Sequence, residues 1–445
     1  MNRPLGWLVY LLVAVGAAAR PVAAAPLIQH WQTANGMRVY FVEAPELPMI
    51  DVRLAFDAGS ARDGGHPGIG RMTTSLLDEG AGEWDADAIA SRFEAVGAQY
   101  SAAVDRDMAW LSLRTLSQPE YRDKALETFV AVAGAPRFDQ RAFERIRNIT
   151  LVALRKQEQE PGDVADKAFY RALYGDHPYA HPVIGTPESV NALSPQLIKG
   201  HYRSYFVARN GILAIVGALA RPQAEALAEQ LSRPLAQGSA APPLPSPRPV
   251  AAARTIRTPF PSEQAHVYLG QLGVRRGDPD YFPLYVGNHI LGGNGLNSLL
   301  VKEVRIKRGL SYSVYSYFIP LAVEGPFELN LQTRADQADK AIEVARDTLA
   351  AYVAKGPTEA QLEAAQKNLT GGFPLRIDSN ANIVSYLVVI GFYGLPLDYL
   401  DTFKDKVSAV TTTGIREAFQ RRLNVDRMVT VIVGSGRGDQ DLEHD

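Results

Sequence analysis

Two hydrogen-bond donors, Arg305 and Tyr312, lie seven residues apart in the second half of the chain. A guanidinium and a phenol held at one place can donate to a developing negative charge, and such donors stabilise a transition state more than the ground state. The two residues also have an ordinary structural interpretation. An Arg near a helix C-terminus is favoured by the helix dipole, and a Tyr in a strand packs in a sheet. Spacing alone leaves both interpretations open.

The elements that must hold this pair are a helix and a strand joined at a tight corner. Residues 297–307 predict a helix with one buried side, and 311–318 alternate as a strand does. Gly309 can supply the left-handed turn that ends the helix, so Arg305 and Tyr312 would flank the corner. The apolar residues on the buried side are Leu299, Leu300, Val304 and Ile306.

A glycine-rich run precedes this helix: Gly292, Gly293, Asn294 and Gly295. No Gly-Lys-Ser/Thr follows the run, so it is not a phosphate-binding loop. By its composition it predicts a turn leading into the helix, with Asn294 or Asn297 as the cap.

Histidines offer a second kind of chemistry. His177 and His181 are four residues apart, a spacing that would hold a metal ion if both lay on one helix. Pro178 and Pro182 disfavour a helix there, so we expect both imidazoles to pack in a loop and His66 to occupy a turn. The chain has no cysteine, which excludes disulfides, thiolate zinc sites and cysteine nucleophiles.

Four stretches of the chain form a set of motifs: 59–77, 151–161, 174–186 and 291–314. The first is a glycine-rich run that leads into a helix, and the second ends in Glu-x-Glu-Pro. The third reads Tyr-Gly-Asp-His-Pro-Tyr-Ala-His-Pro-Val-Ile-Gly-Thr, and the last contains Leu-Gly-Gly-Asn-Gly and Lys-Arg-Gly-Leu-Ser-Tyr-Ser-Val. Together they resemble the pitrilysin/insulinase family of zinc metallopeptidases over nearly the whole mature chain.

This resemblance implies a zinc site that the chain has lost. In the family, the inverted motif HxxEH supplies two His ligands and a Glu general base, and a Glu on a later helix is the third ligand. The matching positions here are Arg71, Thr74 and Ser75, followed by Val152 or its neighbour Ala153. Arg has no acceptor lone pair, and hydroxyls are poor zinc ligands and poor bases. We therefore expect no metal or other cofactor in this chain.

The resemblance also implies roles for the other motifs. In the family, an Arg and a Tyr seven residues apart project from the C-terminal domain into the site of the zinc domain. There they bind the substrate backbone and stabilise the oxyanion, and Arg305 and Tyr312 match this spacing. The family's glycine-rich loop brings backbone close to the substrate, which gives residues 292–295 a second interpretation beside the turn.

Composition and charge set broader limits. A chain of 445 residues with 46% apolar residues is long enough for two or more domains. Its net charge of −2 gives no basic footprint, so nucleic acid is not an expected partner.

Residues 1–24 predict a secretory signal peptide. Arg3 provides the basic start, residues 7–18 form an apolar run too short to span a bilayer, and small residues at 22–24 precede a cleavage site. No second apolar run follows, and no cysteine is present for lipidation. We expect a periplasmic or secreted protein that leaves the membrane once the signal is removed.

The mature chain reads as two similar halves, 25–232 and 255–445, joined by a Pro-rich linker at 233–254. The first half begins with strand-like alternation, continues with helical patterns and reaches a further strand at 211–217, and the second half restarts with strand, helix, strand and helices. This order predicts an α+β fold, in which each half is an antiparallel sheet with helices packed on one side.

A lost zinc half-site beside a retained Arg/Tyr pair implies the non-zinc subunit of a two-subunit peptidase. Such a subunit is inactive alone and pairs with a homologous subunit that carries HxxEH and zinc. Extended peptides would be its substrates, offered as a strand to a sheet edge of the zinc subunit. The alternative is a non-enzymatic scaffold or peptide-binding protein, because family members that lost both half-sites serve as structural subunits. A zinc peptidase active by itself is a third interpretation, and it requires an unrecognised ligand set.

Overall fold

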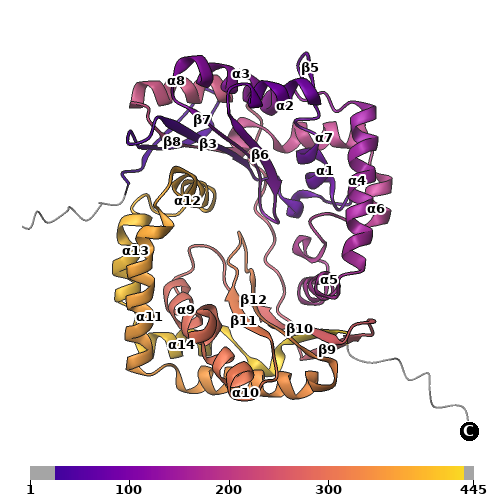
Figure 1. Ribbon diagram of the computed structural model, residues 1–445, viewed down its shortest axis with the longest axis vertical. Coiled ribbons are helices and arrows are strands. Elements are labelled where there is room, and N and C mark those ends of the chain that lie inside the picture. The colour runs from indigo at the N-terminus through magenta and orange to yellow at the C-terminus, as the bar shows by residue number, and fades with distance from the viewer. Residues whose placement is uncertain (1–25, 435–445) are drawn as a thin grey trace, which may run out of the picture.

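The computed structural model describes residues 26–434, so the predicted signal peptide lies outside the described residues. Two sheets, each with its own helices, lie one above the other (Figure 1). This arrangement of mixed sheets and helices in two halves confirms the predicted α+β class. None of the helices within residues 26–434 combines the length and the apolar character needed to cross a bilayer.

The first sheet has six strands in the order β1-β2-β8-β3-β7-β6. Strands β2 and β8 run parallel, and the other neighbouring pairs are antiparallel. The strands are β1 (Gln29–Gln32), β2 (Arg38–Glu43), β3 (Met49–Phe56), β6 (Gln99–Val104), β7 (Ala109–Leu116) and β8 (Gly211–Gly217), with a separate short hairpin of β4 (Gly80–Ala81) and β5 (Trp84–Asp85).

The second sheet has five strands in the order β11-β12-β10-β13-β9. Strands β9 and β13 run parallel, and the remaining pairs are antiparallel. The strands are β9 (Arg254–Thr258), β10 (Gln264–Leu272), β11 (Ser313–Phe318), β12 (Pro326–Arg334) and β13 (Val429–Val433).

The two sheets share one topology. Strands β2, β3, β6, β7 and β8 take the places that β9, β10, β11, β12 and β13 take in the second sheet. In both, the first and last of these strands form the parallel pair, and the third forms an edge. The repeated order that the sequence predicts is therefore a repeat of strand topology.

The helices follow the same division. Those of the N-terminal half are α1 (Ile69–Ser75), α2 (Ala86–Glu94), α3 (Pro119–Gly134), α4 (Gln140–Glu158), α5 (Pro161–Tyr174), α6 (Pro187–Ala192), α7 (Pro195–Tyr205) and α8 (Arg221–Ser232). Those of the C-terminal half are α9 (Tyr281–Asn288), α10 (Ala338–Lys355), α11 (Glu359–Gly372), α12 (Asn380–Tyr393), α13 (Tyr399–Ser408) and α14 (Thr412–Arg422).

Each sheet also receives one helix from the other half. Helix α12 packs on β8, β3 and β2 of the first sheet, opposite α3 and α8, and α5 packs on β10 and β13 of the second (Figure 1). Phe169 of α5 lies 5.5 Å from Tyr268 of β10, measured between ring centroids. The single layer of helices predicted for each sheet is supplied by its own half, and the exchanged helix covers the other face.

A buried carboxylate joins the halves. Asp107, in the turn between β6 and β7, accepts hydrogen bonds from the hydroxyls of Tyr179 and Tyr393 and from the backbone N–H of Ala322. Tyr393 and Ala322 belong to the C-terminal half. Burial raises the pKa of Asp107, and the three donors satisfy its oxygens. Residues 233–253, between α8 and β9, contain no helix or strand.

Candidate functional site

Arg305 and Tyr312 lie together at the start of the edge strand β11. The Arg305 guanidinium carbon is 5.3 Å from the centre of the Tyr312 ring. Tyr312 is 76% exposed, and Arg305 is also exposed. Within residues 26–434, no hydrogen bond or ion pair engages either side chain, whereas the nearby Lys307 and Arg308 both bind Glu303. Arg305 and Tyr312 are therefore free to donate to a ligand.

The segment that carries Arg305 is a π-helix, Val301–Ile306, rather than an ordinary α-helix. The backbone N–H of Lys307 bonds to the carbonyl of Lys302, five residues back, at 3.0 Å. This wider turn shifts the later residues around the axis, and Ile306 is 61% exposed. The prediction that Ile306 is buried is wrong for this reason. Single π-helical turns often mark functional sites.

The glycine-rich run is fitted to the sheet behind it. A Cβ on Gly292 would lie 2.3 Å from the Ser316 hydroxyl of β11, so close packing there requires glycine. Gly295 has φ +47° with open space around it, a conformation that favours glycine. Gly292 and Gly293 end a second π-helical segment, His289–Gly293.

The residue that caps the next helix is Ser298. Its hydroxyl accepts from the N–H of Val301 at 3.4 Å and donates to the carbonyl of Gly295 at 2.8 Å. The prediction of Asn294 or Asn297 as the cap is therefore wrong. Gly309 has the expected left-handed conformation, with φ +62°.

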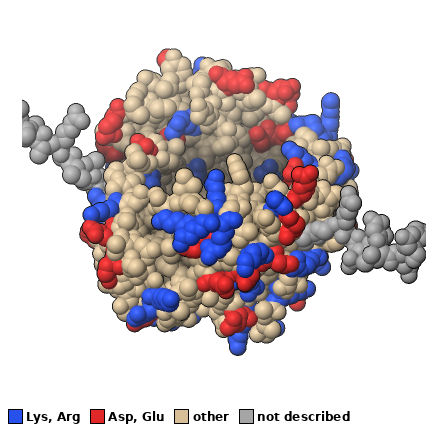
Figure 2. Space-filling model, turned by 60° about the horizontal axis from the view of Figure 1, so that its bottom comes forward, with Lys and Arg blue, Asp and Glu red and all other residues tan. Residues whose placement is uncertain are grey.

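Basic side chains gather on one face of the molecule. Figure 2 shows a hollow in the surface, with Lys and Arg side chains gathered below it. The neighbouring Lys307 and Arg308 hold the pKa of Glu303 below its usual value. This pairing leaves the charge of Arg305 uncompensated by Glu303.

The positions that match the zinc motif lie on α1 and α4. Thr74 is 1% exposed, and its hydroxyl donates to the Gly70 carbonyl at 2.8 Å, within the helix. Arg71, Ser75 and Ala153 are half-buried, and Val152 is 57% exposed. Helices α1 and α4 touch where the Thr150 hydroxyl meets the Met72 sulfur, 3.4 Å away.

These side chains do not fit a zinc ion. None of Arg71, Thr74, Ser75 and Val152 carries an imidazole or a carboxylate, which zinc requires in place of thiolates. Within the described part of the chain, no group of three or more His, Cys, Asp and Glu is placed to hold a metal.

Two buried titratable groups flank the start of α1. The Asp63 carboxylate accepts from the N–H groups of Gly68 and Gly70 at 2.6 and 3.0 Å, and burial raises its pKa to about 8. Burial lowers the pKa of His201 to about 4. A Cβ on Gly70 would lie 3.0 Å from Asp63 Oδ1 and 3.6 Å from His201 Nε2, so this pocket is closely packed.

The other histidines have the packing roles expected from the sequence. His177 Nδ1 accepts from the N–H of Tyr179 at 3.1 Å, and its Nε2 lies 2.8 Å from the Pro245 carbonyl. His181 lies 3.9 Å from Asp63. His66 is exposed in the turn before α1.

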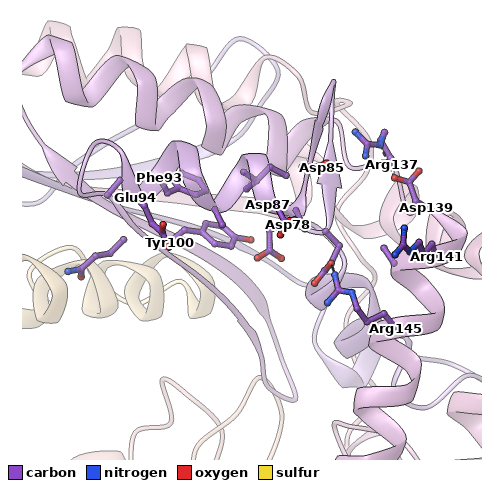
Figure 3. Close-up of a pocket in the computed structure, with 17 residues that line it drawn as sticks. Asp78, Asp85, Asp87, Phe93, Glu94, Tyr100, Arg137, Asp139, Arg141 and Arg145 are labelled. Carbon is purple, nitrogen blue, oxygen red and sulfur yellow. Dashed lines mark hydrogen bonds and ion pairs between the residues drawn. The ribbon is translucent and has the colours of Figure 1, made fainter.

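Sequence analysis missed a cavity of about 950 Å³ between α2, the edge strand β6 and the start of α4. Acidic side chains before and along α2 face Arg137, Arg141 and Arg145 across it (Figure 3). Arg145 pairs with Glu79, and Arg137 with Asp139. Six acidic side chains and three arginines line the cavity, so an excess of negative charge remains after these ion pairs form.

Two family descriptions match the chain. Residues 38–187 match "Insulinase (Peptidase family M16)", and residues 192–369 match "Peptidase M16 inactive domain". Among solved structures, the peptidase M16 inactive domain from Pseudomonas fluorescens superimposes with a TM-score of 0.89. It is 41% identical, with 92% of this chain and 98% of that chain covered.

Two curated relatives carry contrasting descriptions. The "Non-peptidase homolog YmxG" of Helicobacter pylori is 25% identical over 409 residues, which cover 90% of this chain and 93% of that protein. The "Uncharacterized zinc protease YmxG" of Bacillus subtilis is 23% identical over 360 residues, which cover 81% of this chain and 87% of that protein. The fold is thus shared with proteins described as peptidases and with homologues described as inactive.

Proposed function

Because the chain belongs to peptidase family M16, the insulinase family, we propose that it is the non-zinc subunit of a two-subunit peptidase. Its partner is a homologous subunit that carries HxxEH and zinc, and its substrates are extended peptides. The observation that carries this proposal is the pairing of a lost ligand set on α1 with two exposed, unengaged donors at Arg305 and Tyr312 within the described residues.

The role of this chain in hydrolysis follows from the chemistry of those donors. Neither the Arg305 nor the Tyr312 side chain donates a hydrogen bond to a protein group within residues 26–434, so a peptide carbonyl can accept from both. As negative charge develops on that oxygen, a guanidinium and a phenol stabilise it more than they stabilise the ground state. The attacking water and the metal belong to the partner subunit.

The cellular location of the protein is part of the same proposal. The predicted signal peptide supports a periplasmic or secreted protein. The glycine-rich run at 292–295 precedes the segment that carries the pair, and we assign it to contact with the peptide backbone. Gly292 faces β11, so the exposed Gly295 is the residue of the run best placed for that contact.

A reconstitution assay tests the proposal. Peptide cleavage and zinc content are measured for this chain, for a homologue that carries HxxEH, and for their mixture. We expect zinc only in the homologue and full activity only in the mixture. A mixture no more active than the homologue alone would reject the two-subunit enzyme.

Substitutions in the mixture then test the donors. Tyr312→Phe and Arg305→Ala should each lower kcat by about 10²- to 10³-fold, the usual loss for one oxyanion donor. Arg308→Ala and Tyr315→Phe are matched controls, because Arg308 is paired with Glu303 and Tyr315 lies farther along β11. Undiminished turnover with Tyr312→Phe and Arg305→Ala would sink the catalytic role.

The second candidate function is a non-enzymatic scaffold or peptide-binding protein. The description of the Helicobacter pylori relative as a non-peptidase homologue favours it. It predicts peptide binding by this chain with no cleavage in any mixture. The reconstitution assay therefore separates the two candidates.

A further inference from the structure

A smaller cavity of about 300 Å³ lies in the C-terminal half, apart from the Arg305/Tyr312 pair. Its walls come from α9 and the π-helical segment after it, the end of β11, and the turn Phe373–Arg376. The polar side chains that line it are those of Arg276, Tyr281, Tyr285, Asn288, His289 and Arg376.

The charge of this cavity is positive. Among the described residues that line it, Arg276 and Arg376 are charged and no Asp or Glu is present. The nearest acids along the chain have other partners: Asp278 and Asp280 bind Arg422 and Arg421 at 2.7–2.8 Å, and Asp378 accepts from the Asn382 amide at 2.9 Å. Neither Arg276 nor Arg376 has an ion pair within residues 26–434, so both charges remain available to an anion.

Arg276 Nε is buried and has no hydrogen-bond partner among the described residues, which native proteins rarely allow. The Tyr285 phenol and the His289 imidazole line the same cavity. Arg376 lies 5.8 Å from the Tyr285 ring centre, so these groups border one volume. Their convergence indicates a ligand with several acceptor lone pairs.

We propose that this cavity binds a carboxylate of a peptide, either an acidic side chain or a free C-terminus. A guanidinium matches the plane and spacing of a carboxylate, and two of them with a phenol supply donors for both oxygens. The apolar part of the lining, at Val274, Leu284 and Phe318, fits the hydrocarbon part of one residue.

The position of the cavity relates it to the proposed cleavage. Tyr317 at its edge is 46% exposed and belongs to the same edge strand as the residues that follow Tyr312. Five residues of strand span about 17 Å, the length of an extended peptide of about five residues. Only the relation between the cavity and the cleaved bond rests on the proposed function. On that function, the cavity selects peptides with a carboxylate about five residues from the cleaved bond.

Direct binding to the isolated full chain tests the proposal. Three peptides that carry no charge apart from the tested carboxylate are titrated by calorimetry: one with a single Glu and both ends blocked, its Gln counterpart, and the Gln peptide with a free C-terminus. We expect the Glu peptide or the free-C-terminus peptide to bind at least about tenfold more tightly than the blocked Gln peptide, and which of them does so identifies the source of the carboxylate. Equal binding of all three would overturn the proposal.

Variants place the effect in this cavity. The double variant Arg276→Gln with Arg376→Gln should abolish the preference. The milder Tyr285→Phe should reduce it, and this variant serves as the test if the double variant does not fold. Arg155→Gln removes an exposed charge from α4 and should leave the preference unchanged. A preference that survives Tyr285→Phe and the double variant would contradict the assignment, as would inorganic phosphate that displaces the Glu peptide more strongly than free glutamate does.

The outcome is separable from that of the reconstitution assay. A carboxylate preference in a chain that never activates a zinc-bearing homologue would support the cavity and reject the two-subunit enzyme. Activation without any preference would do the reverse.

Discussion

The helices that follow the second common strand of each sheet, α1 after β3 and α9 with its π-helical extension after β10, occupy equivalent places in the two halves. In the N-terminal half, Thr74 occupies the position that matches the general base. Its hydroxyl donates to the Gly70 carbonyl of the same helix and so is not available to a ligand. In the C-terminal half, the segment after the glycine run presents Arg305 and Tyr312 to solvent. On the proposed function, a duplicated scaffold closes one half-site while the other keeps its donors open.

The two halves differ in chemistry but depend on each other for stability. Each lends one helix to the partner sheet, α5 to the second and α12 to the first. Each half must therefore fold whatever chemistry it carries, because the sheet of the other half packs against its helix.

The largest effect is expected from breaking this exchange. Phe169 is fully buried in α5 against the second sheet, so Phe169→Ala should lower the free energy of unfolding by about 3–5 kcal/mol. Hydrogen exchange should rise in β10 and β13 of the other half, since α5 covers them. Leu47→Ala, at an exposed position, is the control. Faster exchange confined to the N-terminal half would show that the halves are energetically independent.

The next prediction contrasts the closed half-site with the open one. Thr74→Glu places a carboxylate at a buried position and should cost about 3 kcal/mol or more of stability. Arg305→Glu, at an exposed position, should change stability by no more than about 0.5 kcal/mol. Urea unfolding of both variants measures the difference. Similar losses for the two would mean that the closed site is not part of the folded interior.

The glycine run provides a test within the open half-site. Gly292→Ala should lose about 1–3 kcal/mol through overpacking against Ser316. Gly295→Ala should lose about 1 kcal/mol, since only its left-handed backbone is strained. Thermal unfolding distinguishes them, and a Gly292 variant as stable as the parent chain would remove the packing explanation for that glycine.

Local features were predictable from the sequence because they depend on near neighbours. Gly309 has the predicted left-handed turn, Pro178 and Pro182 keep His177 and His181 off an α-helix, and Arg305 and Tyr312 flank one corner. The π-helical turn was not predictable, and Ile306 was misplaced, because periodicity assumes a constant number of residues per turn.

Long-range features were harder to predict. The cavity that holds Arg276 and Arg376 joins residues a hundred positions apart, and sequence spacing carries no signal for it. The exchange of α12 did leave a signal. Its sequence is apolar almost all round, including Ile383, Leu387 and Ile390, which is typical of a helix buried on several sides.

A last predicted effect is a pH dependence that belongs to the closed half-site. His201 has a folded pKa of about 4, below its unfolded value, so its contribution to stability is present above pH 6.5 and is lost as pH falls toward 4. Asp63 has a folded pKa of about 8, above its unfolded value, so its contribution is present below pH 4 and is lost as pH rises toward 8. The two slopes oppose each other between these limits.

If one of the two groups is removed, the pH dependence caused by the other becomes measurable. His201→Phe keeps an aromatic ring against Tyr205 and removes the group that gains a proton on unfolding. Between pH 7 and 5.5, the free energy of unfolding of the parent chain should fall by about 1.4 kcal/mol more than that of the variant. Urea unfolding at each pH measures this difference. His30→Phe, in β1 of the same half but distant from α1 in the sequence, is the control. Parallel pH profiles for His201→Phe and the parent chain would show that His201 is not held neutral, and the closed site would then be open to protons from solvent.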